Sequence, residues 1–119
     1  MAASEIERYH GQAAGRTRAT AWGDLVFSVA TAPDPGADIA QQTRRALAAI
    51  DQNLAEAGSD RTRLLSATVY LTDTGNKPGM DEVWNDWVGP REHWPQRACV
   101  QAGLAADTLV EVTVIATRA

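Results

Sequence analysis

The sequence has few of the residues that build metal centres and disulfides. Its 119 residues include one cysteine, Cys99, and two histidines, His10 and His93. One cysteine excludes an intramolecular disulfide, and two separated histidines lack the clustered pattern of metal ligands. The composition therefore predicts a protein without a metal site, suited to the reducing cytoplasm.

Long apolar runs and basic runs are also missing. No segment approaches the roughly 20 apolar residues of a membrane-spanning helix, and the N-terminus lacks the basic and apolar regions of a secretion signal. The 11 basic and 15 acidic residues give a net charge of −4, without a Lys/Arg cluster that could follow a phosphate backbone. We expect no membrane segment and no nucleic-acid partner.

The glycines show neither a dinucleotide-binding nor a phosphate-loop pattern, so no nucleotide cofactor is expected. The length predicts a single domain over residues 1–119. Periodicity predicts, in chain order, strand 4–10, strand 17–22, strand 25–29, helix 39–57, strand 65–71, helix 80–88, strand 96–101 and strand 109–116. Asp38 is a candidate cap of the first helix, and Gly58 is its candidate end. This order favours an α+β fold in which both helices pack on one face of a mostly antiparallel sheet.

The last two predicted strands carry the most informative side chains. Arg97 and Cys99 share one face of strand 96–101, and Glu111 lies within the apolar strand 109–116. Charged groups among apolar strand residues are costly unless they have partners or a ligand. If residues 102–108 form a hairpin connection, Cys99 lies opposite Glu111, and Arg97 and Glu111 are diagonal neighbours about 7 to 8 Å apart.

Simpler interpretations exist for each of these residues. On pattern alone, Arg97 and Glu111 are more readily a cross-strand ion pair, worth about 0.2 to 1 kcal/mol. Cys99 is either a nucleophile or, more in line with a lone cysteine, a small buried hydrophobe. Trp84 and Trp87 follow helical spacing, which is typical of core residues rather than of a ligand-stacking surface.

The segment Pro95–Val100, followed by a short loop and Leu109–Ala116, resembles the closing motif of the reactive-intermediate deaminase family, the Rid or YjgF group. The likeness extends over about residues 4–117 and is greatest to the short YoaB-type members. It implies a chorismate-mutase-like fold with a six-stranded, mostly antiparallel sheet and two helices on one face. It also implies a homotrimer whose sheets form an inner barrel, with active sites in the clefts between subunits.

The resemblance implies an activity and roles for particular residues. Family archetypes hydrolyse 2-imino acids, or enamine tautomers such as 2-aminoacrylate, to 2-keto acids and ammonia, without a metal or an organic cofactor. Arg97 matches the arginine that holds the substrate carboxylate, and Glu111 matches the glutamate that orients water or relays a proton. Cys99 matches a cysteine that lines the site.

Three positions depart from the archetypes. The substrate-lining tyrosine has no counterpart, since Arg16 or Arg18 occupies its region, Val29 stands where a serine is found, and Asp81 stands where an asparagine is usual. The loop before Glu111 is also one residue shorter. These differences concern the pocket for the substrate's side chain more than the carboxylate clamp.

The resemblance implies two alternative functions. The first is a cofactor-independent hydrolase that acts on C=N bonds, with Arg97 and Glu111 as catalytic residues and Arg97, Cys99, Arg16, Val29 and Asp81 lining the substrate site. The second is a non-catalytic trimer that binds small carboxylates in the same clefts as a regulatory or holdase protein. The expected partners are a small 2-imino or 2-keto acid and further copies of the same chain.

Overall fold

One mixed sheet and two helices make up the fold, seen in a computed structural model that describes residues 5–118. The strands are β1 (Glu7–His10), β2 (Thr17–Trp22), β3 (Leu25–Thr31), β4 (Leu64–Leu71), β5 (Gln96–Gln101) and β6 (Val110–Thr117). The helices are α1 (Ile39–Glu56) and α2 (Lys77–Val88), and short 3₁₀ turns cover Arg61–Arg63, Thr74–Asn76 and Arg91–His93. The predicted α+β class and element order are confirmed.

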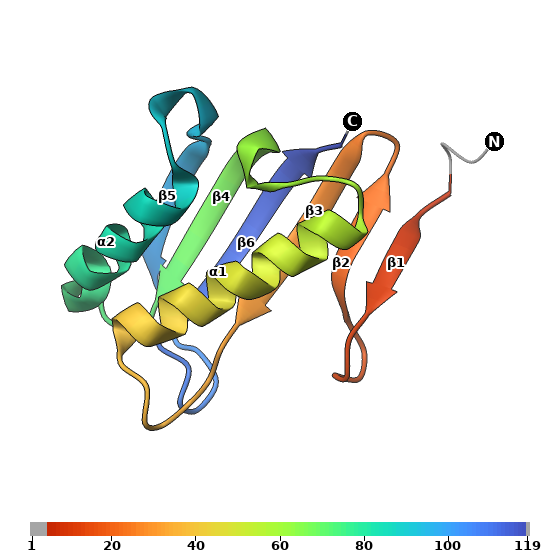
Figure 1. The fold of residues 1–119 in the computed structure, drawn as a ribbon. Coiled ribbons are helices and arrows are strands. Elements are labelled where there is room, and N and C mark those ends of the chain that lie inside the picture. Colours follow the sequence, from red (N-terminus) through yellow and green to blue (C-terminus); the bar gives the residue numbers. More distant parts are fainter. Residues whose placement is uncertain (1–4, 119) are drawn as a thin grey trace.

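The strand order in the sheet is β1-β2-β3-β6-β4-β5, so β1 and β5 are its two edges (Figure 1). All neighbouring strands are antiparallel except β4 and β5, which run parallel. Parallel neighbours need a crossover connection, and α2 supplies it. The predicted side-by-side pairing of β5 with β6 is therefore wrong, because β4 lies between them.

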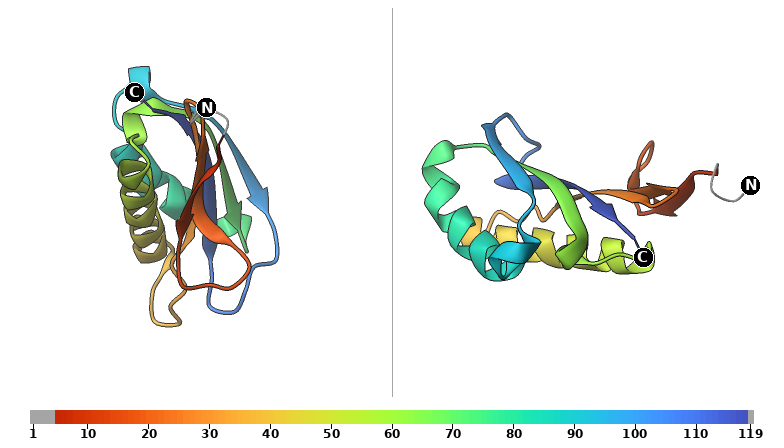
Figure 2. Two further views of the ribbon diagram at one scale, coloured as in Figure 1. Left: turned by 90° about the vertical axis from the view of Figure 1, so that its right-hand side faces the viewer. Right: turned by 90° about the horizontal axis from the view of Figure 1, so that it is seen from above.

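Both helices cover the same face of the sheet, as predicted, and no helix of residues 5–118 lies on the other face (Figure 2). On the covered face, the core combines residues of α1 with alternate residues of the central strands: Leu47, Ile50, Leu54, Val26, Val69, Leu71, Val110 and Val112, all at most 1% exposed. Trp84 and Trp87 of α2 join this core, which confirms their interpretation as packing residues.

Helix α1 begins and ends at the residues that the sequence indicated. The Asp38 side chain accepts from the Gln41 backbone N–H while the Gln41 side chain accepts from the Asp38 N–H, which forms a capping box. Gly58, with φ of +82°, follows the helix end and adopts the left-handed conformation that glycine tolerates best. Helix α2 begins at Lys77, three residues before the apolar stripe that predicted it, since Pro78 fits its first turn.

Gln42 ties together two loops at one end of the sheet. Its side chain is 1% exposed, donates to the backbone oxygens of Asp34 and Asp107 at 3.1 and 2.9 Å, and accepts from the Leu109 N–H at 2.9 Å. Asp107 has a φ of +63°, an uncommon value for a residue other than glycine. One buried amide thus holds both loops next to the start of β6.

We expect Gln42→Leu to lower the free energy of unfolding by about 1 to 3 kcal/mol, since it leaves the Leu109 N–H without its partner and removes one of the two hydrogen bonds that each of the Asp34 and Asp107 carbonyl oxygens accepts. Urea denaturation measures this difference. The matched control is Gln52→Leu, an exposed position on the same helix, where we expect a change within about 0.5 kcal/mol. Equal effects from both variants would show that the Gln42 hydrogen bonds do not matter for stability.

Candidate functional site

Arg97 lies on edge strand β5 and points toward α2 on the covered face. Its Nη2 atom lies 2.7 Å from Asp81 Oδ1, and Nη1 lies 3.7 Å from the Met80 sulfur. The guanidinium carbon is 5.2 Å from the Trp84 ring centroid, within the range of a cation–π contact. With its side chain 18% exposed, Arg97 is held by three residues of one helix but remains in contact with solvent.

Asp81 is the anion between two cations. Lys77 Nζ donates to Asp81 Oδ2 at 2.7 Å, one helical turn away, while Arg97 faces Oδ1. Oδ1 is buried and receives no well-directed hydrogen bond from residues 5–118, so its contact with Arg97 is an ion pair. Burial raises the pKa of Asp81, but the hydrogen bond from Lys77 and the charge of Arg97 outweigh burial and leave the pKa below its usual value.

Cys99 follows Arg97 on the same face of β5 and pairs with Val69 of β4. Its side chain is half-buried and packs against the hydrophobic core, and its thiol is free. This environment is that of a small hydrophobe next to the Arg97 cluster. The nucleophile interpretation gains no support from it.

Glu111 lies on the other face of the sheet. Its neighbours on β6, Val110 and Val112, are buried under the helices, and the alternation of a strand therefore directs Glu111 to the open face. The expected diagonal contact between Arg97 and Glu111 within one chain is wrong, because the two residues lie on opposite faces with β4 between their strands.

A cavity of about 530 Å³ brings Glu111 together with the two other predicted pocket residues, Arg16 and Val29. The connection between β1 and β2 contributes Arg16, β3 contributes Val29, and the loop before β6 contributes Thr108. The six predicted site residues therefore fall into two groups. We call Arg97, Cys99 and Asp81 the arginine half-site, and Glu111, Arg16 and Val29 the glutamate half-site.

Arg16 and Arg18, the two alternatives for the tyrosine region, both line this cavity, but their contacts differ. Arg18 is bound within the fold: it donates to Asn53 Oδ1 at 2.8 Å and to the His10 backbone oxygen at 3.1 Å, and it pairs with Glu56 at 2.6 Å. Arg16 is exposed, and its one described hydrogen bond goes to the Ala14 backbone oxygen at 3.3 Å. Arg16 is therefore the arginine with donors available to a ligand.

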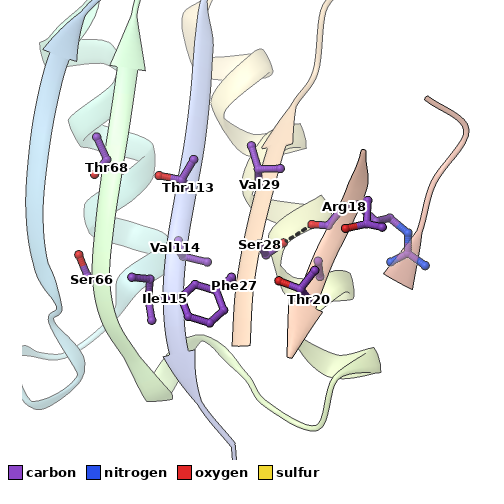
Figure 3. Close-up of a pocket in the computed structure, with 12 residues that line it drawn as sticks. Arg18, Thr20, Phe27, Ser28, Val29, Ser66, Thr68, Thr113, Val114 and Ile115 are labelled. Atoms are coloured by element: carbon purple, nitrogen blue, oxygen red, sulfur yellow. Dashed lines mark hydrogen bonds between the residues drawn. The ribbon is translucent and has the colours of Figure 1, made fainter. Parts of the chain in front are cut away.

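The open face of the sheet carries a second, smaller cavity of about 360 Å³ (Figure 3). Its lining mixes apolar side chains with small hydroxyls: Phe27, Val29, Ile115, Ser66, Thr68 and Thr113 are all labelled in the close-up. Phe27 is 39% exposed, and Leu65 and Trp22 are still more exposed. Exposed large apolar side chains of this kind often mark a contact with another molecule.

Sequence reasoning missed the residues that hold Arg97. Lys77 and Met80 were not expected at the site, and Trp84 was expected only in the core, although all three lie on α2 with Asp81. The spacing of Lys77 and Asp81 by four residues was the available signal, since such residues meet on a helix. No group of three or more His, Cys, Asp or Glu side chains within residues 5–118 could hold a metal ion, and no helix in this range could span a membrane.

Comparisons with known proteins agree on one family. The sequence model described as "Endoribonuclease L-PSP" matches residues 14–118. A "RutC family protein" of Haemophilus ducreyi is 36% identical over 95 residues, 79% of this chain and 80% of that protein. The "RutC family protein YoaB" of Escherichia coli is 35% identical over 102 residues, 80% of this chain and 89% of that protein.

The fold has close counterparts among solved structures. NMB1025 of Neisseria meningitidis, described as a member of the YjgF protein family, superposes with a TM-score of 0.90 at 36% identity, covering 98% of both chains. An uncharacterized protein of Pseudomonas aeruginosa gives a TM-score of 0.88 at 35% identity, covering 97% of this chain and all of that one. The fold of this chain is thus the YjgF fold.

The Asp81 ion pairs predict a pH-dependent contribution to stability. Because the pKa of Asp81 is lowered by folding, its ionised form stabilises the protein above the unfolded pKa of about 3.9, and this stability is lost as the pH falls through the lower folded value. We expect the free energy of unfolding of wild type to exceed that of Asp81→Asn by on the order of 1 kcal/mol at pH 6. This difference should shrink below about pH 4.

Urea denaturation between pH 2.5 and pH 7 tests this expectation. Asp86→Asn is the control, because Asp86 is exposed on the same helix and has no ion pair within residues 5–118. A difference between wild type and Asp81→Asn that stays constant over this range would contradict the proposed contribution of the Asp81 charge.

Proposed function

The chain belongs to the Endoribonuclease L-PSP family, the RutC/YjgF/Rid group, and we propose that it hydrolyses imines and enamines of small 2-keto acids. One relative, from Acinetobacter baylyi, is named "3-aminoacrylate deaminase RutC" and is 34% identical over 80 residues. In the proposed reaction, water adds to the imine carbon and the C–N bond then breaks. The products are a 2-keto acid and ammonia.

Arg97 is the proposed carboxylate clamp. A guanidinium can hold a carboxylate by two parallel, charge-assisted hydrogen bonds and fix its plane. Contacts with Asp81 and Trp84 hold the Arg97 side chain in one place before any ligand arrives. A clamp fixed in advance loses less conformational entropy on binding.

Glu111 is the proposed acid or base. It lines a cavity large enough for a small keto acid, beside Arg16 and Val29. A carboxylate there can orient the attacking water, accept its proton and return a proton to the departing nitrogen. Arg16 and Val29 then lie beside the substrate's side chain, where the family archetypes have a tyrosine and a serine.

The single observation that carries the proposal is the division of the site into two halves. Arg97 and Glu111 lie on opposite faces of one sheet, so one substrate can contact both only if two chains contribute. A head-to-tail contact joins two different patches of neighbouring chains and, where the rotation closes, repeats that pairing around a ring. The apolar open face supports the proposed homotrimer, in which the sheets would form an inner barrel and cover Phe27 and Ile115.

A non-catalytic role is the alternative, and one observation favours it. Asp81 already occupies part of the Arg97 guanidinium, which suits weak and reversible binding of a carboxylate as well as it suits turnover. Cleavage of RNA, which the family description names, is not favoured, because the net charge of −4 opposes binding to a phosphate backbone. We place either function in the cytoplasm, where a lone free thiol remains reduced.

Substitution of Arg97 tests the proposed imine hydrolysis. An amino-acid oxidase generates 2-iminopropionate, semicarbazide traps it, and the protein is expected to slow the formation of semicarbazone. Arg97→Ala should reduce this activity by at least about 100-fold, and Arg97→Lys by roughly tenfold, since lysine cannot bind in a bidentate manner. Arg91→Ala, an exposed arginine nearby, is the control and should retain full activity.

Wild-type protein that leaves the rate of semicarbazone formation unchanged would contradict the deaminase proposal. Binding of a keto acid that depends on Arg97, in the absence of turnover, would then support the non-catalytic alternative.

The second prediction tests whether two chains share the site. Arg97→Ala and Glu111→Gln chains, each inactive alone, are unfolded, mixed in equal amounts and refolded. In a ring, about one quarter of the sites then combine an intact Arg97 with an intact Glu111 from a neighbour, so about one quarter of the wild-type activity should return.

The matched control mixes Arg97→Ala with the double variant Arg97→Ala/Glu111→Gln, in which no site contains an intact Arg97. Activity that fails to return in the first mixture, although native mass spectrometry shows mixed rings, would place both residues of each site in one chain.

A further inference from the structure

The charge of Arg97 is largely balanced before a ligand binds. The Asp81 carboxylate lies 2.7 Å from Nη2, and the two side chains are 26% and 18% exposed, respectively. Charges this far removed from water interact more strongly than charges on an open surface. Any anion that approaches Arg97 therefore also approaches the negative charge of Asp81.

Lys77 balances Asp81 only in part. It reaches the other carboxylate oxygen, Oδ2, at 2.7 Å, but its side chain is 46% exposed and its charge is therefore better screened by solvent. The interaction of Asp81 with a ligand on Arg97 is not cancelled by this lysine. The buried oxygen Oδ1 faces the arginine, whereas the solvated cation sits on the opposite side of the carboxylate.

We propose that Asp81 is a specificity-determining residue that weakens the hold of Arg97 on anionic 2-keto acids. This inference rests on the proposed role of Arg97 as a carboxylate clamp. A 2-imino acid with a protonated nitrogen has no net charge, whereas the keto acid product has a charge of −1. Asp81 repels the carboxylate of both compounds but attracts only the cationic nitrogen of the first, so its charge disfavours the product and promotes its release.

The test measures the binding of 2-oxobutyrate by isothermal titration calorimetry, which requires no turnover. Asp81→Asn keeps the size of the side chain and an oxygen to contact Arg97, but removes the charge. We expect this variant to bind 2-oxobutyrate roughly tenfold more tightly than wild type. Arg97→Ala should abolish the binding of 2-oxobutyrate, whether it is introduced into wild type or into Asp81→Asn.

A second variant keeps the inference testable if Asp81→Asn folds poorly. Asp81→Ser also removes the charge, with a smaller side chain, and we expect it to bind 2-oxobutyrate more tightly than wild type by a similar factor. Glu82→Gln is the matched control for net charge, since Glu82 is exposed next to Asp81 and pairs with no cation within residues 5–118. It should change the affinity less than twofold.

The outcomes separate this inference from the proposed function. If wild type binds 2-oxobutyrate through Arg97 but Asp81→Asn binds equally or more weakly, the clamp stands and the inference is overturned. Tighter binding by Asp81→Asn, with no imine hydrolysis by either protein, supports the inference and overturns the deaminase. If neither protein binds 2-oxobutyrate, both the clamp and the inference are overturned.

Discussion

The parallel pairing of β5 with β4 decides where the functional side chains lie. Because α2 carries the chain from the end of β4 back to the start of β5, both strands run in the same direction and β5 becomes an edge. Arg97 is thereby directed to the helix that made the crossover, where Asp81 and Trp84 meet it. Glu111, on β6, is directed to the open face. One connection thus separates the two residues whose chemistry the proposed reaction combines.

One face of the sheet is uncovered because the helices are few. Both α-helices cover the other face, and residues 5–118 contain no further α-helix. Phe27 and Ile115 face outward there, among hydroxyl side chains. Covering a surface of this composition lowers the free energy, by about 25 cal/mol for each Å² of apolar area removed from water. The proposed ring would bury this face and unite the half-sites by one and the same association.

Local signals in the sequence predicted the local structure well. The cap at Asp38, the glycine that ends α1 and the apolar stripe of α2 each depend on residues close in the chain, and all three are confirmed. The sequence could not reveal that β4 lies between β5 and β6, because strand order depends on packing between distant segments. The predicted connection over residues 102–108 looks like a hairpin, but the connection between Gln101 and Val110 is long enough to pass the end of a third strand.

For the predicted site too, the sequence indicated the residues but not their arrangement in space. The residue types at Arg97 and Glu111 indicated chemistry, and Arg16, Val29 and Glu111 do line one cavity. Their division into two half-sites was not visible, since it follows from the face on which each strand directs its side chains. The contacts of Arg97 with Met80 and Trp84 were likewise hidden, because helical spacing identified the α2 stripe only as apolar.

A crystal structure of the protein with bound 2-oxobutyrate would test the central claim most directly. The account predicts a ring in which Arg97 of one subunit binds the carboxylate while Glu111 of a neighbouring subunit lies beside the keto carbon. A keto acid bound entirely by one chain, or bound away from both Arg97 and Glu111, would contradict it.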